Sequence, residues 1–278
     1  MSIFQMVKLH LIQQYTIKKL SPIIMFMLLY TSVMLLPLRD IASTYQTQYS
    51  YGIIALVLTG KFYPAYMAIG VVLLFNVLPI ENSFQFWLIL KAGYLKWMIT
   101  QVIYLTISSF LFVFVNVIMI LGLLFPYVQF NNDWGKLIYS IAENRIEGSN
   151  LLLEYSQYSA VTLDYYSPDK AFIQSIVLWV LVVLLFGMVI LSFNYIYKQL
   201  GTCLASGMIV LALFIQFANG IWVQFVSPLT WLSIYYIKHE VQSGLLSYEQ
   251  VLIRCCSVII SLIMLICVVV IKKRGGAR

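Results

Sequence analysis

The sequence predicts an all-α, polytopic membrane protein with six transmembrane helices. Of its 278 residues, 62% are hydrophobic and only 10% are charged, whereas a soluble domain carries about 25% charged residues. Several apolar runs reach the roughly 20 residues that a helix needs to cross a bilayer. Because polar connections separate these runs, we expect residues 1–278 to form a single transmembrane domain.

Residues 1–21 are expected to form a helix that lies in the membrane interface before the first span, or that simply extends this span. Ser21-Pro22 favours a span that starts there, because proline fits the first helical position. The lysines of the interfacial helix are expected to face anionic lipid. Its predicted apolar face gathers Phe4, Val7, Leu11 and Tyr15.

The second span is preceded by an ambiguous stretch. Residues 53–58 are apolar but too few to cross a bilayer. We expect them to form a short helix or a re-entrant piece on the outer side, or the outer extension of the second span. Spans one and two together occupy residues 22–80. The third span is predicted over residues 98–126, the fourth and fifth over 172–226, and the sixth over 251–271.

The remaining polar stretches connect these spans. Residues 127–171 form a long loop, in which Asn132 or Asp133 is expected to cap a short helix beginning at Trp134. Ser167-Pro168-Asp169 predicts the cap and first turn of a helix that leads into the fourth span. Residues 227–250 are expected to be re-entrant or interfacial, and residues 272–278 form a tail.

The positive charges predict which ends of the spans face the cytoplasm. With six spans, both termini, the 81–97 loop and the turn at Lys198 lie on one side, which then carries ten basic residues and one acidic residue. The other side carries seven basic and nine acidic residues. Since cytoplasmic connections are enriched in Lys and Arg, the termini are expected inside and the 127–171 loop outside. The net charge of +7 is therefore a topology signal, and no nucleic-acid partner is expected.

Residues 81–97 predict a short cytoplasmic helix between the second and third spans. Asn82 and Gln85 have the spacing of a helix start, and Lys91-Ala92-Gly93 is typical of a helix end. The intervening helix of about ten residues is too short to cross a bilayer. We expect a protein groove to bury part of it, because it is apolar on nearly every side through Phe84, Phe86, Trp87, Leu88, Ile89 and Leu90.

The sequence has none of the common motifs of a membrane enzyme. It contains no HExxH, G-x-S-x-G, paired acidic or G-x-x-x-x-G-K-[ST] motif. Its two histidines and four cysteines lack metal-ligand spacing. No acidic residue lies deep in an apolar run, where ion-coupled carriers commonly need one. The chain is therefore not expected to be an enzyme or to bind a metal or cofactor, and energy for any transport has to come from a partner.

Three amides of the fifth predicted span share one helical face. Gln216, Asn219 and Gln224 fall within about 140° of arc. Amides in a span usually face protein or water, so this face either lines a substrate path or makes hydrogen bonds between helices, with the second reading slightly favoured. Four amides are isolated in the sequence and are interpreted as packing groups: Asn76, Gln101, Asn116 and Asn194.

Taken together, these features resemble the permease subunits of type-two ABC exporters, and in particular a group of small Gram-positive bacterial permeases. The resemblance rests on six spans with inside termini, an interfacial N-terminal helix and the turn Lys91-Ala92-Gly93-Tyr94-Leu95-Lys96-Trp97 before a long third span. The sequences Asn131-Asn132-Asp133-Trp134-Gly135 and Ser227-Pro228…Trp231 also fit this group.

The resemblance implies a permease of the bacterial plasma membrane, paired with an identical or related permease above two cassette ATPase subunits that bind the ATP and Mg. The wider family exports peptides, lipids, polysaccharides and drugs, and a peptide is the favoured substrate of this chain. A non-pumping membrane protein that binds a peptide, such as an immunity protein, is the alternative. In the exporter, residues 81–97 form the coupling helix and meet the ATPase through Glu81, Phe84, Trp87, Leu88 and Lys91.

Overall fold

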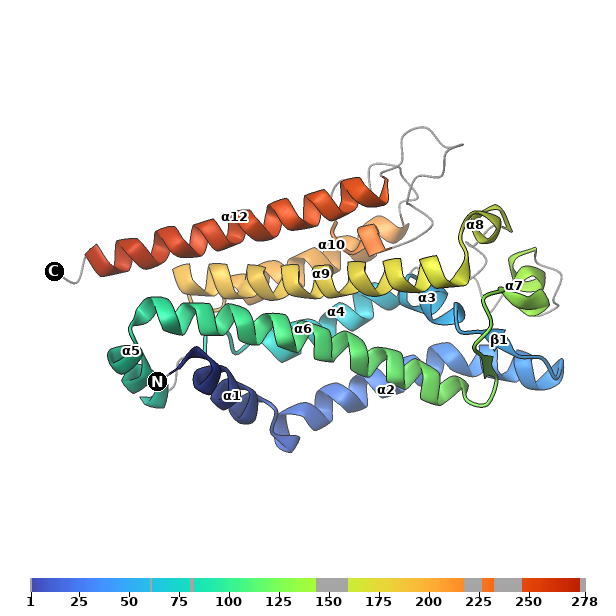
Figure 1. Ribbon diagram of the computed structural model, residues 1–278, viewed down its shortest axis with the longest axis horizontal. Coiled ribbons are helices and arrows are strands. Elements are labelled where there is room, and N and C mark those ends of the chain that lie inside the picture. Colours follow the sequence, from blue (N-terminus) through green and yellow to red (C-terminus); the bar gives the residue numbers. More distant parts are fainter. Residues whose placement is uncertain are drawn as a thin grey trace.

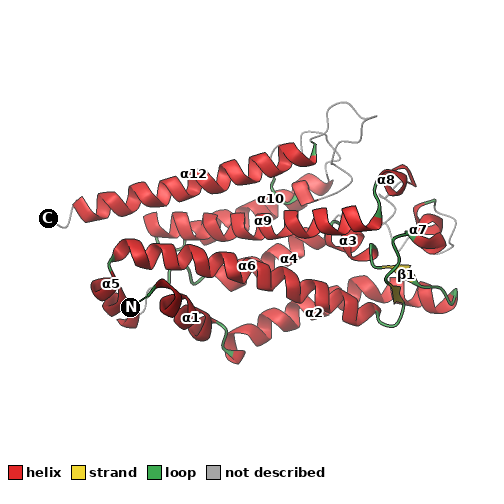
Figure 2. Cartoon of the chain, viewed as in Figure 1, coloured by secondary structure: helices red, strands yellow, loops and turns green. Residues whose placement is uncertain are grey.

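The computed structural model describes residues 2–60, 62–80, 83–143, 160–217, 227–232 and 247–275. This part of the chain is almost entirely helical (Figure 2), as predicted, apart from one two-residue parallel ladder. Its helices are α1 (Ile3–Gln14), α2 (Ile17–Thr44), α3 (Ile53–Leu58), α4 (Tyr63–Phe75), α5 (Ser83–Ala92), α6 (Tyr94–Leu124), α7 (Gly135–Ala142), α8 (Ala160–Tyr165), α9 (Pro168–Ile196), α10 (Leu200–Phe217), the 3-10 turn η2 (Thr230–Leu232) and α12 (Tyr248–Gly275), and its strands are β1 (Tyr49–Ser50) and β2 (Val128–Gln129).

In the described part of the chain, four helices are long and apolar enough to cross a membrane, namely α2, α6, α9 and α12. The helices at the second and fifth predicted spans, α4 and α10, are shorter, with 13 and 18 residues in the described part. Figure 1 shows the long helices lying along one another. α5 lies at one end of this bundle, and α7 and α8 lie at the other.

α9 forms the core of the bundle. In its most apolar stretch 72% of the residues are buried, against 22% in α2 and 28% in α12. It packs against α3, α4, α6, α10 and α12, so protein surrounds it on nearly every side. α2 and α12 instead expose apolar side chains such as Leu29 and Met264, which a membrane or another protein has to cover.

Two glycines let neighbouring helices approach α9 closely. A Cβ added at Gly187 of α9 would lie 2.8 Å from a terminal carbon of Leu105 on α6. A Cβ added at Gly201 in the first turn of α10 would run into the backbone of Ile190 on α9. Small residues commonly allow such close contacts between membrane helices.

The N-terminal region differs from the prediction in its boundary. α1 ends at Gln14 and α2 already begins at Ile17. Pro22 therefore lies inside α2 and not at its first position. α1 starts with a capping box, in which the Ser2 hydroxyl accepts from the Gln5 amide and the Gln5 side chain accepts from the Ser2 amide.

The predicted apolar face of α1 packs within this chain only in part, with Leu11 and Tyr15 partly buried against the core. Of that face only Val7 is fully buried, and Phe4 is 79% exposed. α1 packs against α6, and its buried side contains both apolar and polar side chains. The buried side chains of α1 are Met6, Val7, His10 and Gln14.

The ambiguous apolar run before the second span forms a separate, buried helix. All six residues of α3 are less than 5% exposed, and a break at Thr59-Gly60 separates α3 from α4. At this break the indole Nε1 of Trp179 on α9 donates to the Leu58 carbonyl over 2.8 Å. Because the last carbonyls of a helix have no partner within it, this bond satisfies a group that the break leaves open.

The end of the bundle opposite α5 carries a small cap. β1 and β2 pair in parallel, with Tyr49 opposite Val128, a contact that the sequence did not predict. The indole of Trp134 donates to the Tyr166 carbonyl over 2.6 Å and so joins the start of α7 to the start of α9. Burial raises the pKa of the Tyr166 hydroxyl to about 12, above its usual value of about 10.

Of the two helix starts predicted in this cap, one is confirmed. Ser167 caps α9, accepting from the Lys170 amide over 3.4 Å, with Pro168 in the first turn. α7 instead starts at Gly135 with Trp134 in the cap position and without a side-chain cap, so the predicted cap by Asn132 or Asp133 is wrong. Gly135 begins α7 with a positive φ of 77°, which favours glycine there.

Candidate functional site

The predicted short helix between the second and third spans is present as α5 and has ten residues. Trp87 and Leu90 are 69% and 62% exposed, and Lys91 is exposed beside them. Leu88 is only 5% exposed, so its side chain packs within this chain. Glu81 and the side chain of Phe84 lie outside the described part of the structure.

The exposed residues of α5 form one surface, which we call the α5 outer face and define by Trp87, Leu90 and Lys91. Their spacing of three and four residues places them on the same side of a helix. α5 packs against α6, and among its described side chains, those of residues 87–92, Leu88 is the buried one. Two large apolar groups and a lysine thus lie exposed at one end of the bundle, where a partner can cover them.

A single residue joins α5 to α6. Gly93 has φ 84° and ψ 148°, a conformation close to one that is essentially restricted to glycine. α6 begins at Tyr94, directly after this glycine, so the helix of the third predicted span extends four residues before residue 98. One residue therefore separates the end of α5 from the start of α6.

Three aromatic side chains fix the start of α6 against the end of α9. The ring centroid of Tyr195 lies 6.2 Å from that of Tyr94 and 6.0 Å from that of Trp97, in edge-to-face contacts. Tyr94 and Trp97 are 5.4 Å apart, and Trp97 is fully buried. Such aromatic pairs contribute about 0.5–1.5 kcal/mol beyond the area that they bury, so this contact holds the base of α6 in place.

Asn194, near the end of α9, joins three segments close to α5. Its Nδ2 donates to the Leu78 carbonyl over 2.6 Å, in the segment that leads from α4 to α5. Its Oδ1 accepts from the amides of Gly201 and Thr202 over 2.8 and 3.4 Å. These amides belong to the first turn of α10, so Asn194 does for α10 what an N-cap residue normally does. The segment before α5 is thereby tied to both α9 and α10.

A second polar network lies inside the bundle, away from α5. The Tyr63 hydroxyl of α4 lies 3.4 Å from the Thr31 hydroxyl of α2 and donates to Oδ1 of Asn116 on α6 over 3.3 Å. Asn116 is therefore a link between α4 and α6 and not an isolated amide. Gln101 is buried as well, but among the described residues neither of its amide atoms has a hydrogen-bond partner.

Sequence reasoning missed the linking roles of Asn116 and Asn194 because their partners are distant in the chain. Leu78 precedes Asn194 by 116 residues and Tyr63 precedes Asn116 by 53. One signal for the role of Asn194 is local. Asn194 lies only seven residues before Gly201, so a tight turn can bring its side chain to the first turn of the next helix.

The predicted amide face lies mostly outside the described residues. α10 extends to Phe217, so Gln216 is in its last turn, but the position of the Gln216 side chain is not described. Asn219 and Gln224 both follow the described end of α10. A role of these three amides in a substrate path therefore stays a prediction.

The described part of the chain holds no group of three His, Cys, Asp or Glu side chains placed to bind a metal ion. Comparison of the chain with protein families, with curated proteins and with solved structures finds no match. Its class is therefore defined by the fold: it is an α-helical, membrane-embedded protein. A distinctive feature of the described part is the short helix α5 at one end of the bundle, which exposes Trp87 and Leu90 and is separated from α6 by Gly93 alone.

Proposed function

We propose that this chain is the transmembrane subunit of an ATP-driven exporter and that a separate cassette ATPase binds the α5 outer face. The observation that carries the proposal is the exposure of Trp87 and Leu90 on a helix too short to span a membrane. A short helix laid in a groove of a partner is a recurring mode of recognition. Full burial of one such side chain contributes about 1.5–3 kcal/mol, so a groove over both would bind firmly.

The connections of α5 support a coupling role for this contact. Only Gly93 separates α5 from α6, and Asn194 ties the segment before α5 to α9 and α10. The aromatic contact of Trp97 with Tyr195 adds a second link from α6 to α9. Movement imposed on α5 by an ATPase is therefore transmitted to most of the bundle, as alternating access requires.

The distribution of charge supports a cytoplasmic position for α5. Figure 1 shows α1, α5 and the C-terminal end of α12 toward the same end of the bundle. This end carries Lys91, Lys96 and Lys198, and Lys272 and Lys273 lie in the last turns of α12. By the positive-inside rule we assign this end to the cytoplasm of a bacterial cell, where ATP is available.

The remaining parts of the proposal concern assembly and substrate. The exposed apolar faces of α2 and α12 leave room for a second permease, identical or related, as well as lipid. A peptide is the favoured substrate, and Gln216, Asn219 and Gln224 are proposed to line its path between the two permeases.

The test is co-purification of the ATPase. The tagged chain is extracted from its native membranes in mild detergent, and the proteins that accompany it are identified by mass spectrometry and assayed for ATP hydrolysis. Replacing both Trp87 and Leu90 by alanine is expected to lower recovery of the ATPase at least tenfold, since tenfold requires only about 1.4 kcal/mol. Phe114→Ala is the matched control, because Phe114 is 61% exposed but lies in the middle of α6.

The outcomes separate the contact from the function. Wild-type recovery of the ATPase by the outer-face variant would refute the contact. If the unaltered chain brings down no ATPase, the exporter proposal is refuted and a non-pumping peptide-binding protein is favoured. Leu88→Ala serves as a folding control: because Leu88 is buried, it is expected to lower thermal stability in detergent.

The orientation is tested independently by cysteine labelling. In a chain without its four native cysteines, Asn132→Cys is expected to react with an impermeant thiol reagent in intact cells. Lys96→Cys is expected to react only after the membrane is opened. Both positions are exposed in the structure, so the reverse pattern would show that α5 faces outward and would remove the ATPase contact.

A further inference from the structure

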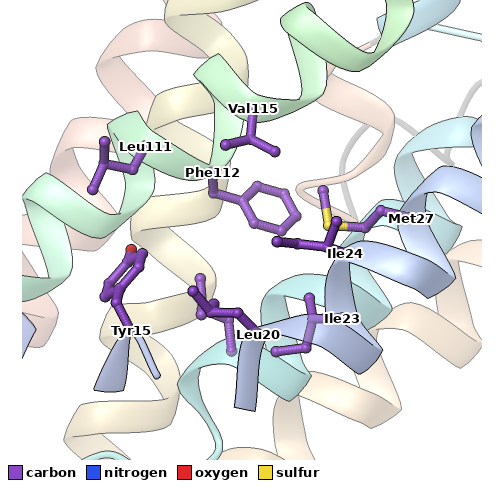
Figure 3. A pocket seen from close by; sticks show the side chains of 9 residues that line it. Tyr15, Leu20, Ile23, Ile24, Met27, Leu111, Phe112 and Val115 are labelled. Carbon is purple, nitrogen blue, oxygen red and sulfur yellow. The ribbon is translucent and has the colours of Figure 1, made fainter. Parts of the chain in front are cut away.

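An apolar cavity of about 250 Å³ lies where α1 meets α2 (Figure 3). Its walls come from the first three turns of α2, from the middle of α6 and from Leu74 of α4. Tyr15, in the elbow between α1 and α2, is the one lining residue with a hydroxyl group. The side chains that shape the cavity include Leu20, Ile24, Met27, Leu111 and Phe112.

The mouth of this cavity faces the membrane-exposed side of the bundle. Ile24 of α2 and Leu111 of α6 line the cavity and are each 39% exposed, so the cavity reaches the surface between these helices. Met25, Phe110 and Phe114 flank it and are 58–63% exposed. A surface of this kind on two membrane-spanning helices is covered by lipid chains.

Water is a poor occupant of this cavity. An ordered water needs two to four polar partners, and the lining offers a single hydroxyl. An apolar cavity of about 150 Å³ stays dry and takes up a six-carbon ring. A cavity of about 250 Å³ therefore has room for a chain segment of about ten carbons.

Positive charge marks one end of the cavity. Lys19 lies one turn before Ile23 and two turns before Met27, so the three residues share the face of α2 that lines the cavity. The Lys19 ammonium donates to Oε1 of Gln14 over 3.0 Å, which holds it at the elbow, and Lys18 is exposed beside it. The sequences of α1, α4 and α6 contain no acidic residue, and the one acid of α2, Asp40, lies at its far end.

From these observations we propose that the cavity is a binding site for one phospholipid of the bilayer with an anionic headgroup. One acyl chain enters between α2 and α6, and the headgroup binds Lys18 and Lys19 at the elbow. The bound chain fills the gap between α2 and Phe112 and so braces the first span against the third. This site is independent of the proposed exporter function, because it requires neither an ATPase nor a transported substrate.

The position of the lipid is tested by photocrosslinking of the full-length chain. Phosphatidylglycerol with a diazirine in one acyl chain is added to the protein in nanodiscs, irradiated and located by mass spectrometry. Label is expected to concentrate in residues 20–27 and 111–115. Ile24→Trp, which fills the cavity from α2, is expected to lower this label at least tenfold, while label on α12 stays unchanged. Val115→Phe fills the cavity from α6 and is expected to lower the label as well. This second variant keeps the test valid if α2 does not fold normally with tryptophan at position 24.

The headgroup preference is tested with the same probe on phosphatidylcholine. Replacing Lys18 and Lys19 by glutamine is expected to lower retention of phosphatidylglycerol about fivefold per lysine, as about 1 kcal/mol for each implies, and to leave phosphatidylcholine unaffected. Lys8→Gln, an exposed lysine of α1, is the control. Equal labelling by both lipids would refute the anionic headgroup. The site would be refuted by lipid label that is spread evenly over α2, α6 and α12. It would also be refuted if two copies of the chain became crosslinked to each other and no lipid label appeared.

Discussion

Replacing Asn194 by leucine tests the connection between α9, α10 and the segment before α5. The change keeps the size of the side chain but removes its bonds to the Leu78 carbonyl and to the Gly201 amide, of 2.6 and 2.8 Å. Each bond contributes about 1 kcal/mol net, and part-buried groups left without a partner add to the loss, which gives about 2–3 kcal/mol in total. At about 2–4 °C per kcal/mol the melting temperature falls by about 4–12 °C.

The assay combines thermal unfolding in detergent with hydrogen exchange. The leucine variant is expected to speed exchange in residues 200–203 and to loosen residues 76–80. Asn194→Asp keeps the acceptor for the α10 amides and loses the donor to the Leu78 carbonyl. Only residues 76–80 are therefore expected to loosen. Asn76→Leu is the control, because Asn76 is an exposed amide at the end of α4. A melting temperature within 1 °C of wild type for Asn194→Leu, with unchanged exchange, would refute this account, since the smallest expected shift is about 4 °C.

Three further predictions concern backbone freedom, close packing and the outer cap. Gly93→Ala is expected to cost about 1–3 kcal/mol because of its backbone conformation and to increase exchange in α5, whereas Gly122→Ala, at an unconstrained position of α6, is neutral or stabilising. Gly187→Ala is expected to lower the melting temperature, because the added methyl group forces α6 away from α9. Adding Leu105→Val is expected to recover part of this loss. A lower melting temperature that Leu105→Val does not recover would contradict the contact. Trp134→Phe removes the indole donor of the cap and is expected to speed proteolysis before α9, with unchanged cleavage as the contrary result.

The sequence predicted the elements that local chemistry determines. The end of α5 at Ala92-Gly93 and the start of α9 at Ser167-Pro168 follow from capping and backbone preferences within a few residues. α3 remained ambiguous because six apolar residues have no readable period. The burial of His10 and Gln14 on α1 was not predicted, because polar side chains indicate a surface position and only tertiary packing against α6 covers them.

The candidate site was predictable only in part, for a related reason. A ten-residue apolar helix indicates that some of its side chains need a partner, but not which ones. The structure separates Leu88, which the bundle itself buries, from Trp87, which it leaves exposed. The role of Asn194 depends on Leu78, far away in the chain, and the apolar cavity depends on how α2, α4 and α6 pack together. Such features arise from tertiary packing, which a single sequence does not reveal.

The break between α3 and α4 affects how the chain enters the membrane during synthesis. The Leu58 carbonyl is satisfied by the indole of Trp179, which is synthesised 121 residues later. Until then this carbonyl has no such donor, and an unsatisfied backbone group costs several kcal/mol in hydrocarbon. α3 and α4 are thus expected to wait at the membrane surface or beside the insertion machinery until α9 emerges. α4 would then be completed after α9, so the order in which these helices settle differs from their order in the chain.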